Sequence, residues 1–265
     1  MIGLRFNAFR WRNQALTRVE TISPRRNLCR ALPGFAANFT KSLALAISAV
    51  GVCANSPAKG QGQVYDPLPP PGSAYVRFVN SLDDDLEVRP NFLPSQRLGA
   101  TFADRVTPYF VVEKVAGRDL VFMLKDATRA GQVTLRAEAG TFVTIVAQAG
   151  SGQDIGAVPV IDKTDFNQTR ARLSFYNTTV GCPSATLALA DSGTAVFQDV
   201  APGSAKARSV NPVEADVVAS CVGRKAPAFA LRGIEAGGMY SAWLMPHASE
   251  ATAFLTRDVT ARWKP

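Results

Sequence analysis

Hydrophobic and polar residues alternate along many short stretches of the chain, with turn-forming residues between them. In residues 74–80, Ala-Tyr-Val-Arg-Phe-Val-Asn, every second side chain is expected to face a core, because successive side chains of a strand point to opposite faces. No stretch reaches convincing helical length or period. The expected strands of the first half are 74–80, 86–89, 100–102, 108–112, 120–125, 132–136, 141–148 and 157–161. Those of the second half are 170–176, 186–189, 195–198, 205–210, 215–220, 229–232, 239–246 and 254–263.

The opening stretch has a copy at residues 171–177, Ala-Arg-Leu-Ser-Phe-Tyr-Asn, 97 positions later. Two further matches keep this spacing: Asp-Leu-Val at 119–121 with Asp-Val-Val, and Glu-Ala-Gly at 138–140 with the same three residues. Three matches in one register predict an internal duplication. Turn signals at about ten-residue spacing favour sandwiches over a parallel sheet, which needs helices between strands. The predicted fold class is all-β, with two tandem antiparallel β-sandwich domains, 73–163 and 168–265.

The first 54 residues have the composition of an export leader. They hold eight Lys or Arg and one Glu, so nearly all of the formal charge of +8 lies there. An uncharged run at 42–54 follows, which predicts a signal peptide and export to the periplasm. An uncleaved anchor, a twin-arginine signal at Arg25-Arg26 and a lipoprotein at Cys53 are alternatives. The remaining chain is nearly neutral, which argues against nucleic acid as a partner. Residues 55–72, rich in Gly and Pro, are expected to form an extended linker.

Two of the four cysteines, Cys182 and Cys221, lie beyond the leader. Export to an oxidising compartment makes a disulfide the expected state, and closing a loop of about 40 residues would contribute roughly 4 kcal/mol. Two free buried thiols are the alternative. A metal site would need more ligands than these residues and the single histidine, His247, supply, so no metal or other cofactor is expected.

Residues that could carry catalysis are few. His247 is the chain's one histidine, and no Gly-x-Ser-x-Gly sequence is present. A histidine in a loop without a recognisable nucleophile is more often a solvated residue than a base, so the chain is not expected to be an enzyme. The acidic run 83–87, Asp-Asp-Asp-Leu-Glu, lacks the spacing and glycine of a calcium loop. A solvated turn is therefore favoured over a calcium site.

Arginine and aromatic residues gather on the faces of the two matching strands that point away from the predicted cores. Arginine pairs with carboxylates and aromatic rings stack on sugar rings, so these residues form a candidate surface for an acidic polysaccharide or a partner. A plain solvated face is the alternative. The residues are Tyr75, Arg77, Arg170, Arg172 and Tyr176.

Residues 64–80, Val-Tyr-Asp-Pro-Leu-Pro-Pro-Pro-Gly-Ser-Ala-Tyr-Val-Arg-Phe-Val-Asn, resemble the start of the mature alginate O-acetylation protein AlgF family. The likeness extends over residues 64–265, with an Asn ending a strand at Asn177, Asn211-Pro212 later, and a closing segment to Trp263. The cysteine pair and the long leader depart from that pattern. The resemblance implies a noncatalytic periplasmic accessory protein required for O-acetylation of alginate or a related exopolysaccharide.

The same resemblance implies two protein partners. One is a membrane-bound O-acyltransferase and the other a periplasmic serine-hydrolase-like acetyltransferase, which this protein would bridge. Two alternatives stay open. One is an exported tandem β-sandwich that binds carbohydrate or a surface and is unrelated to acetylation, and the other is a direct acyl carrier or transferase that uses a serine or His247.

Overall fold

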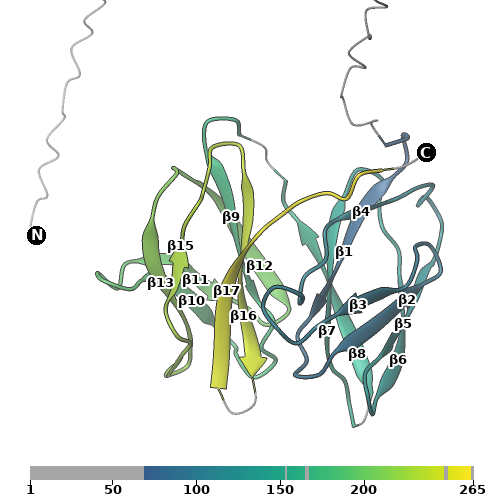
Figure 1. The fold of residues 1–265 in the computed structure, drawn as a ribbon, viewed down its shortest axis with the longest axis horizontal. Helices are drawn as coiled ribbons and strands as arrows, with labels where there is room; N and C mark the ends of the chain where they lie inside the picture. Colours follow the sequence, from purple (N-terminus) through teal and green to yellow (C-terminus); the bar gives the residue numbers. More distant parts are fainter. Residues whose placement is uncertain (1–68, 153, 165–166, 248–249, 264–265) are drawn as a thin grey trace, which may run out of the picture. The chain divides into compact units, whose positions relative to one another are not determined.

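A computed structural model of the chain describes residues 69–152, 154–164, 167–247 and 250–263. The regular elements of these residues are all β-strands (Figure 1). None of the described segments forms a helix with the length and hydropathy needed to cross a bilayer. The predicted leader, 1–54, and most of the predicted linker, 55–72, lie outside the described residues.

The first half of the described chain forms two sheets of four strands each, with orders β4-β1-β7-β8 and β3-β2-β5-β6. Its strands are β1 (Ala74–Asn80), β2 (Leu86–Pro90), β3 (Gln96–Leu98), β4 (Phe110–Val112), β5 (Leu120–Lys125), β6 (Ala130–Leu135), β7 (Phe142–Ala149) and β8 (Ile155–Asp162). The two sheets enclose one hydrophobic core.

The second half repeats this arrangement, with sheets β12-β9-β16-β17 and β11-β10-β13-β14, and with β15 also paired to β13. Its strands are β9 (Ala171–Asn177), β10 (Ala185–Leu189), β11 (Ala195–Val200), β12 (Ser204–Val210), β13 (Ala215–Cys221), β14 (Arg224–Lys225), β15 (Phe229–Leu231), β16 (Met239–His247) and β17 (Glu250–Arg257). These sheets enclose a second core.

The two halves share strand order and register. β1 pairs with β7 in parallel, with Tyr75 opposite Phe142, and β9 pairs with β16 in parallel, with Arg172 opposite Met239. Each residue of the second pair lies 97 positions after its counterpart, from 75 to 172 and from 142 to 239. The predicted all-β tandem sandwiches are confirmed, but each contains this one parallel pair. A parallel pair needs a crossover connection, which the strands of the other sheet provide.

The predicted inward faces of the two matching strands are correct. Ala74, Val76 and Phe78 are at most 1% exposed and belong to the first core. Their copies in β9 are fully buried in the second core. Burying a large apolar side chain contributes about 1.5–3 kcal/mol, so the alternation specifies which face of each sheet packs inward.

An asparagine ends each matching strand and fixes the loop that follows it. Asn80 is fully buried, and its amide nitrogen donates to the carbonyls of Asp84 at 2.8 Å and Gly99 at 3.0 Å. Its Oδ1 accepts the backbone N–H of Leu82 at 3.0 Å. One side chain thus pairs two backbone groups of the loop after β1 and the carbonyl of Gly99, which follows β3.

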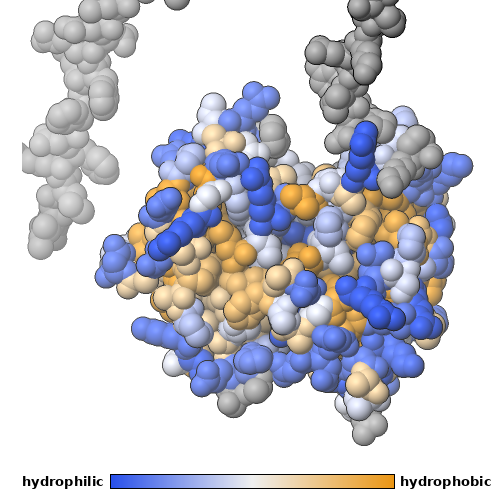
Figure 2. Space-filling model, in the orientation of Figure 1, coloured by the Kyte–Doolittle hydropathy of each residue, from blue (hydrophilic) through white to orange (hydrophobic). Residues whose placement is uncertain are grey.

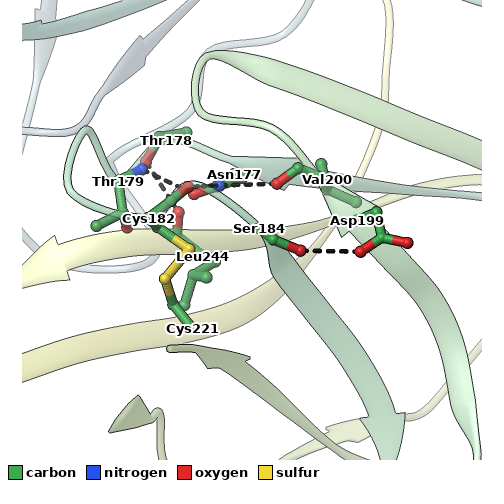
Figure 3. The surroundings of a disulfide bond; sticks show 9 residues. All are labelled: Asn177, Thr178, Thr179, Cys182, Ser184, Asp199, Val200, Cys221 and Leu244. Atoms are coloured by element: carbon green, nitrogen blue, oxygen red, sulfur yellow. Dashed lines mark hydrogen bonds between the residues drawn. A yellow bond between two sulfur atoms is a disulfide. The ribbon is translucent and has the colours of Figure 1, made fainter. Parts of the chain in front are cut away.

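The copy, Asn177, makes the same three kinds of bond (Figure 3). Its amide nitrogen donates to the carbonyls of Cys182 at 2.8 Å and Val200 at 3.0 Å, and its Oδ1 accepts the N–H of Thr179 at 3.1 Å. The second half adds a disulfide at this point, since the sulfur atoms of Cys182 and Cys221 are 2.11 Å apart. The disulfide therefore joins the loop after β9 to the end of β13.

Two of the expected strands are displaced in the structure. Residues 100–102 were expected as a strand, but β3 lies earlier, and Asp104 N–H donates to the Thr101 carbonyl at 3.0 Å in a turn. The expected closing strand 254–263 instead begins at Glu250 and ends at Arg257. The residues after it leave the second sandwich and pair with Tyr109, next to β4 (Figure 1).

Candidate functional site

The candidate site is a buried polar network centred on Arg77, in the middle of β1. This side chain is 1% exposed and points away from the first core. Its Nη1 donates to Asp258 Oδ1 at 2.6 Å, and its Nη2 donates to the Tyr176 hydroxyl at 2.9 Å and Ser241 Oγ at 3.1 Å. Its Nε donates to Thr144 Oγ1 at 2.7 Å. One guanidinium therefore bonds to both sandwiches.

A second carboxylate, Asp162, lies at the end of β8. It accepts hydrogen bonds from Thr144 Oγ1 at 2.6 Å, from the Tyr109 hydroxyl at 2.8 Å, and from the Tyr176 hydroxyl. Burial raises the pKa of Asp162, and the charge of Arg77 and these hydrogen bonds offset that only in part. Protonation of Asp162 is therefore easier than that of an exposed aspartate.

The charge of Arg77 is retained in spite of its burial. Burial is the largest single effect and disfavours the charged guanidinium, but Asp258, Tyr176, Tyr109 and Asp162 together outweigh it, so the pKa of Arg77 is raised. Burial also raises the pKa values of Tyr109 and Tyr176, so both phenols stay protonated at neutral pH and can donate to Asp162. The network therefore holds one fixed cation between two carboxylates.

Aromatic rings surround the guanidinium. Its Cζ lies 4.4 Å from the ring centroid of Tyr109, 4.9 Å from that of Trp243 and 5.3 Å from that of Tyr176. Tyr176 and Trp243 stack with centroids 4.2 Å apart. Such contacts stabilise a desolvated cation by about 2 kcal/mol. Because Arg77 fills the space between these rings, the network supports the junction between the sandwiches rather than an open ligand site.

An apolar cluster completes this junction. It combines residues from the outer faces of the two sheets that contain β1 and β9, so each of these sheets is buried on both faces. The members are Val79, Val146, Val160, Tyr176, Trp243, Met245 and Phe254.

The five residues predicted as one exposed surface lie in different environments. Arg77, Arg172 and Tyr176 are buried, with exposed fractions of 1%, 6% and 2%. Tyr75 is partly buried, and Arg170 is exposed. The expected exposure is therefore wrong for three of the five. Arg77 and Tyr176 meet each other in the network, because the outer face of each sheet is covered by the other sandwich.

Six residues of the network were not singled out by the sequence: Tyr109, Thr144, Asp162, Ser241, Trp243 and Asp258. They lie on different strands or at strand ends, and only the packing of the sandwiches brings them together. One local signal could have indicated the network. Arg77 lies in the centre of a strand with apolar residues on either side, and an arginine that is buried there is expected to have a partner.

His247 lies at the end of β16, where the sequence placed it, and is exposed. Its Nδ1 is 3.2 Å from Asp83 Oδ1, and the two side chains are 61% and 54% exposed. This pair links the end of β16 to the loop after β1. An exposed histidine paired with an exposed aspartate does not by itself form a nucleophile and base.

The acidic run 83–87 forms separate contacts. Asp85 Oδ1 accepts the N–H of Ala100 at 3.1 Å, and Glu87 pairs with Arg89 at 2.9 Å. Within the described ranges, no group of three or more His, Cys, Asp or Glu side chains is placed to hold a metal ion.

The surface near the junction is mixed in character. Figure 2 shows apolar and hydrophilic residues interspersed over the drawn face. A cleft of about 620 Å³ lies beside β4, where the aromatic residues Phe92, Phe110 and Trp263 line it together with Arg118. Trp263 Nε1 donates to Glu113 Oε1 at 2.8 Å, which fixes the segment after β17 at this cleft. A second cleft, of about 450 Å³, lies between β8 and β12.

No model of a known protein family matches the chain. The sequence is similar to the alginate biosynthesis protein AlgF of Pseudomonas aeruginosa strain PAO1, with 29% identity over 179 residues, which span 66% of this chain and 73% of that protein. The chain is a distant relative of AlgF. Among solved structures, a candidate cell adhesion protein from Bacteroides ovatus covers 74% of this chain and 99% of its own at 10% identity, with a TM-score of 0.24. That TM-score is too low to carry an inference.

Proposed function

We propose that this protein is a noncatalytic, exported accessory protein required for O-acetylation of alginate or a related exopolysaccharide. The observation that carries the proposal is the similarity to AlgF, which extends over 66% of the chain. The opening segment of the first sandwich, which resembles the AlgF family, is consistent with this relationship. Acetylation is the step that the family resemblance implies.

The protein acts as an adaptor that bridges a membrane-bound O-acyltransferase and a periplasmic serine-hydrolase-like acetyltransferase. Two features support this role. The hydrogen bonds of Arg77 and the apolar cluster at the junction connect two sandwiches, so that surfaces on both are held in a fixed relation. The only histidine, His247, is exposed and paired with Asp83, which does not favour acyl transfer by this chain itself.

The test compares the acetyl content of secreted polysaccharide from strains that carry a gene deletion, His247→Ala or Lys225→Ala, the last being a matched exposed control. The deletion is expected to abolish acetylation, and both substitutions to leave it within about twofold of wild type. Removing a general base costs about two to four orders of magnitude in rate. Loss of acetylation in the His247→Ala strain at normal protein level would favour a direct acyl transferase instead.

A binding protein unrelated to acetylation is the second candidate. The observation that favours it is the cleft beside β4, where Trp263 and Phe110 lie with Arg118, since aromatic and arginine side chains are common in sites for acidic sugars. The same measurement separates the two candidates. Under this alternative, the deletion strain secretes polymer with unchanged acetyl content.

A further inference from the structure

The junction between the sandwiches has an approximate twofold relationship. Ser81 Oγ and Thr178 Oγ1 hydrogen-bond to each other at 2.8 Å, and the two residues are 97 positions apart, which is the spacing of the duplication. Contact between a residue and its own copy is the property of a twofold-related interface. The junction should therefore have two similar seams, one where β17 approaches β4 and one where β8 approaches β12.

The first seam is closed by the segment that follows β17. Tyr109 N–H donates to the Val259 carbonyl at 2.9 Å, and Ala261 N–H donates to the Tyr109 carbonyl at 2.8 Å. Thr260 forms a parallel bridge with Tyr109. The residues after β17 thus act as a short strand that covers the edge of the first sandwich next to β4.

The second seam lacks such a strand among the described residues. The copy of Tyr109 is Ala207, because Val112 and Val210 occupy equivalent positions opposite Ala74 and Ala171. Within the described segments, β12 pairs with β9 alone and so forms an edge of its sheet. The cleft of about 450 Å³ lies at this edge. The edge therefore presents backbone groups that can pair with an added strand.

Three cations line this cleft, Lys163, Lys206 and Arg208, together with one carboxylate, Asp162. Asp162 accepts hydrogen bonds from Thr144 and Tyr109, so the cations outnumber the acidic groups of the lining by three to one. Lys206 Nζ donates to the Gln198 carbonyl at 2.7 Å, and Arg208 Nη1 donates to the Val196 carbonyl at 3.0 Å. These carbonyls orient the two cations but do not neutralise them. No ion pair links the three cations to a carboxylate of the described residues. The cleft therefore favours a negatively charged occupant.

The lining of the cleft favours a polypeptide over a sugar polymer. Its aromatic side chains, Tyr176 and Phe197, are only 2% and 6% exposed, so neither offers a ring face on which a sugar could stack. Ile161, at 71% exposure, provides an apolar contact at the rim. An extended peptide can use both features, through backbone pairing with β12 and alternating side chains.

We propose that the edge of β12 and this cleft bind an extended acidic segment of a partner protein as an added strand. Its carboxylates face Lys163, Lys206 and Arg208, and its alternate apolar side chains lie toward Ile161. That the occupant is a protein rests on the adaptor function proposed above. The cations of the cleft then specify that the bound segment of this protein is acidic.

The probe is a fluorescently labelled peptide, Val-Glu-Val-Glu-Val-Glu-Val, with the seven-residue length of β12. Fluorescence anisotropy with the purified protein is expected to show salt-sensitive binding. The peptide Val-Glu-Pro-Glu-Pro-Glu-Val carries the same charge. It should bind at least about tenfold more weakly, because proline has no N–H to donate to a sheet. The double variant Lys206→Glu, Arg208→Glu should also raise the Kd at least about tenfold.

The matched control is the double variant Arg224→Glu, Lys225→Glu, which makes the same charge change on exposed residues of β14. It should keep the Kd within about twofold, and the thermal midpoint of each variant shows that it is folded. Equal binding of the proline peptide, or unchanged binding by the Lys206 and Arg208 variant, would overturn the proposal. So would an oligouronate that binds wild type but not the Lys206 and Arg208 variant, when the valine peptide does not bind wild type.

Failure here is distinguishable from failure of the adaptor function. If deletion of the gene abolishes acetylation while the double variant binds and acetylates as wild type does, the docking site is wrong and the function stands. If the peptide binds at β12 but deletion leaves acetylation unchanged, the function is wrong and the docking site stands.

Discussion

At the scale of single residues, Arg77 shows what an alternating pattern does and does not specify. The pattern correctly placed Phe78 in the core and Arg77 on the opposite face of β1. It could not show that this opposite face is also buried, because Asp258 and Trp243 come from the other sandwich. Local sequence therefore predicted the orientation of the side chain, and only the packing of the two halves determined its surroundings.

Replacing Arg77 with methionine is expected to lower the free energy of unfolding by about 3–5 kcal/mol, because it leaves Asp258 buried without its cation. Urea denaturation measures the change. Arg170→Met, at an exposed position, is the control and should change stability by less than about 0.5 kcal/mol. Combining Arg77→Met with Asp258→Asn should recover part of the loss. Equal stability of Arg77→Met and wild type would contradict the role given to this network.

The raised pKa of Asp162 predicts that its contribution to stability changes with pH in the direction opposite to that of most aspartates. Its pKa is raised by burial, so the native state binds a proton more tightly than the unfolded state does. The contribution of this group to stability is then largest at low pH and is lost as the pH rises through the raised pKa. Asp162→Asn cannot titrate and should lack this decline.

Denaturation of wild type and Asp162→Asn from about pH 4, near the ordinary pKa of aspartate, to neutral pH tests the sign. The difference in unfolding free energy should move in favour of the variant as pH rises. Asp258→Asn is a useful comparison, because it removes the ion-pair partner of Arg77 instead. A difference that moves in favour of wild type with rising pH would show that the pKa of Asp162 is lowered in the native protein.

At the scale of elements, most strands could be predicted from alternation and turn residues, and the failures have physical causes. Residues 100–102, Ala-Thr-Phe, look like a strand by composition, but Thr101 Oγ1 donates to Asp104 Oδ2 at 2.8 Å and supports a turn. Phe102 stacks on Phe254 of the second sandwich at 4.9 Å, a contact that local sequence does not contain. The parallel pairing of β1 with β7 likewise could not be predicted from local sequence, because it depends on long-range topology.

The disulfide between Cys182 and Cys221 belongs to this scale, since it joins the loop after β9 to the end of β13. The bonded residues are 39 positions apart, and such a closure contributes roughly 4 kcal/mol in the chain-entropy model. In the variant with both cysteines changed to alanine, the free energy of unfolding measured by urea denaturation should fall by an amount of that order. Reduction of wild type should reproduce the loss, and reductant should not affect the variant. Labelling of both thiols in denatured, unreduced protein would show that the bond is absent.

At the scale of the whole described molecule, the duplication could be predicted from three short matches, whereas the way the two copies pack could not. Val146 and its copy Trp243 both lie in the apolar cluster at the junction, yet they are different residue types, so their shared role is invisible in an alignment of the halves. Val79 and its copy Tyr176 also both lie in this cluster and also differ in residue type. The copies kept their inward faces similar, while their outward faces became complementary to each other.

This complementarity predicts that the two sandwiches unfold together. Val146 is 1% exposed, and Val146→Glu places a charge without a partner in the cluster that joins them. Differential scanning calorimetry of wild type should show one transition, with equal calorimetric and van't Hoff enthalpies. The variant should show two transitions, since each half retains its own core. Met123→Glu, at a position that is 48% exposed on β5, is the control and should keep the single transition. Two separate transitions in wild type would mean that the junction contributes too little free energy to couple the halves, and that the buried network around Arg77 is not what holds them together.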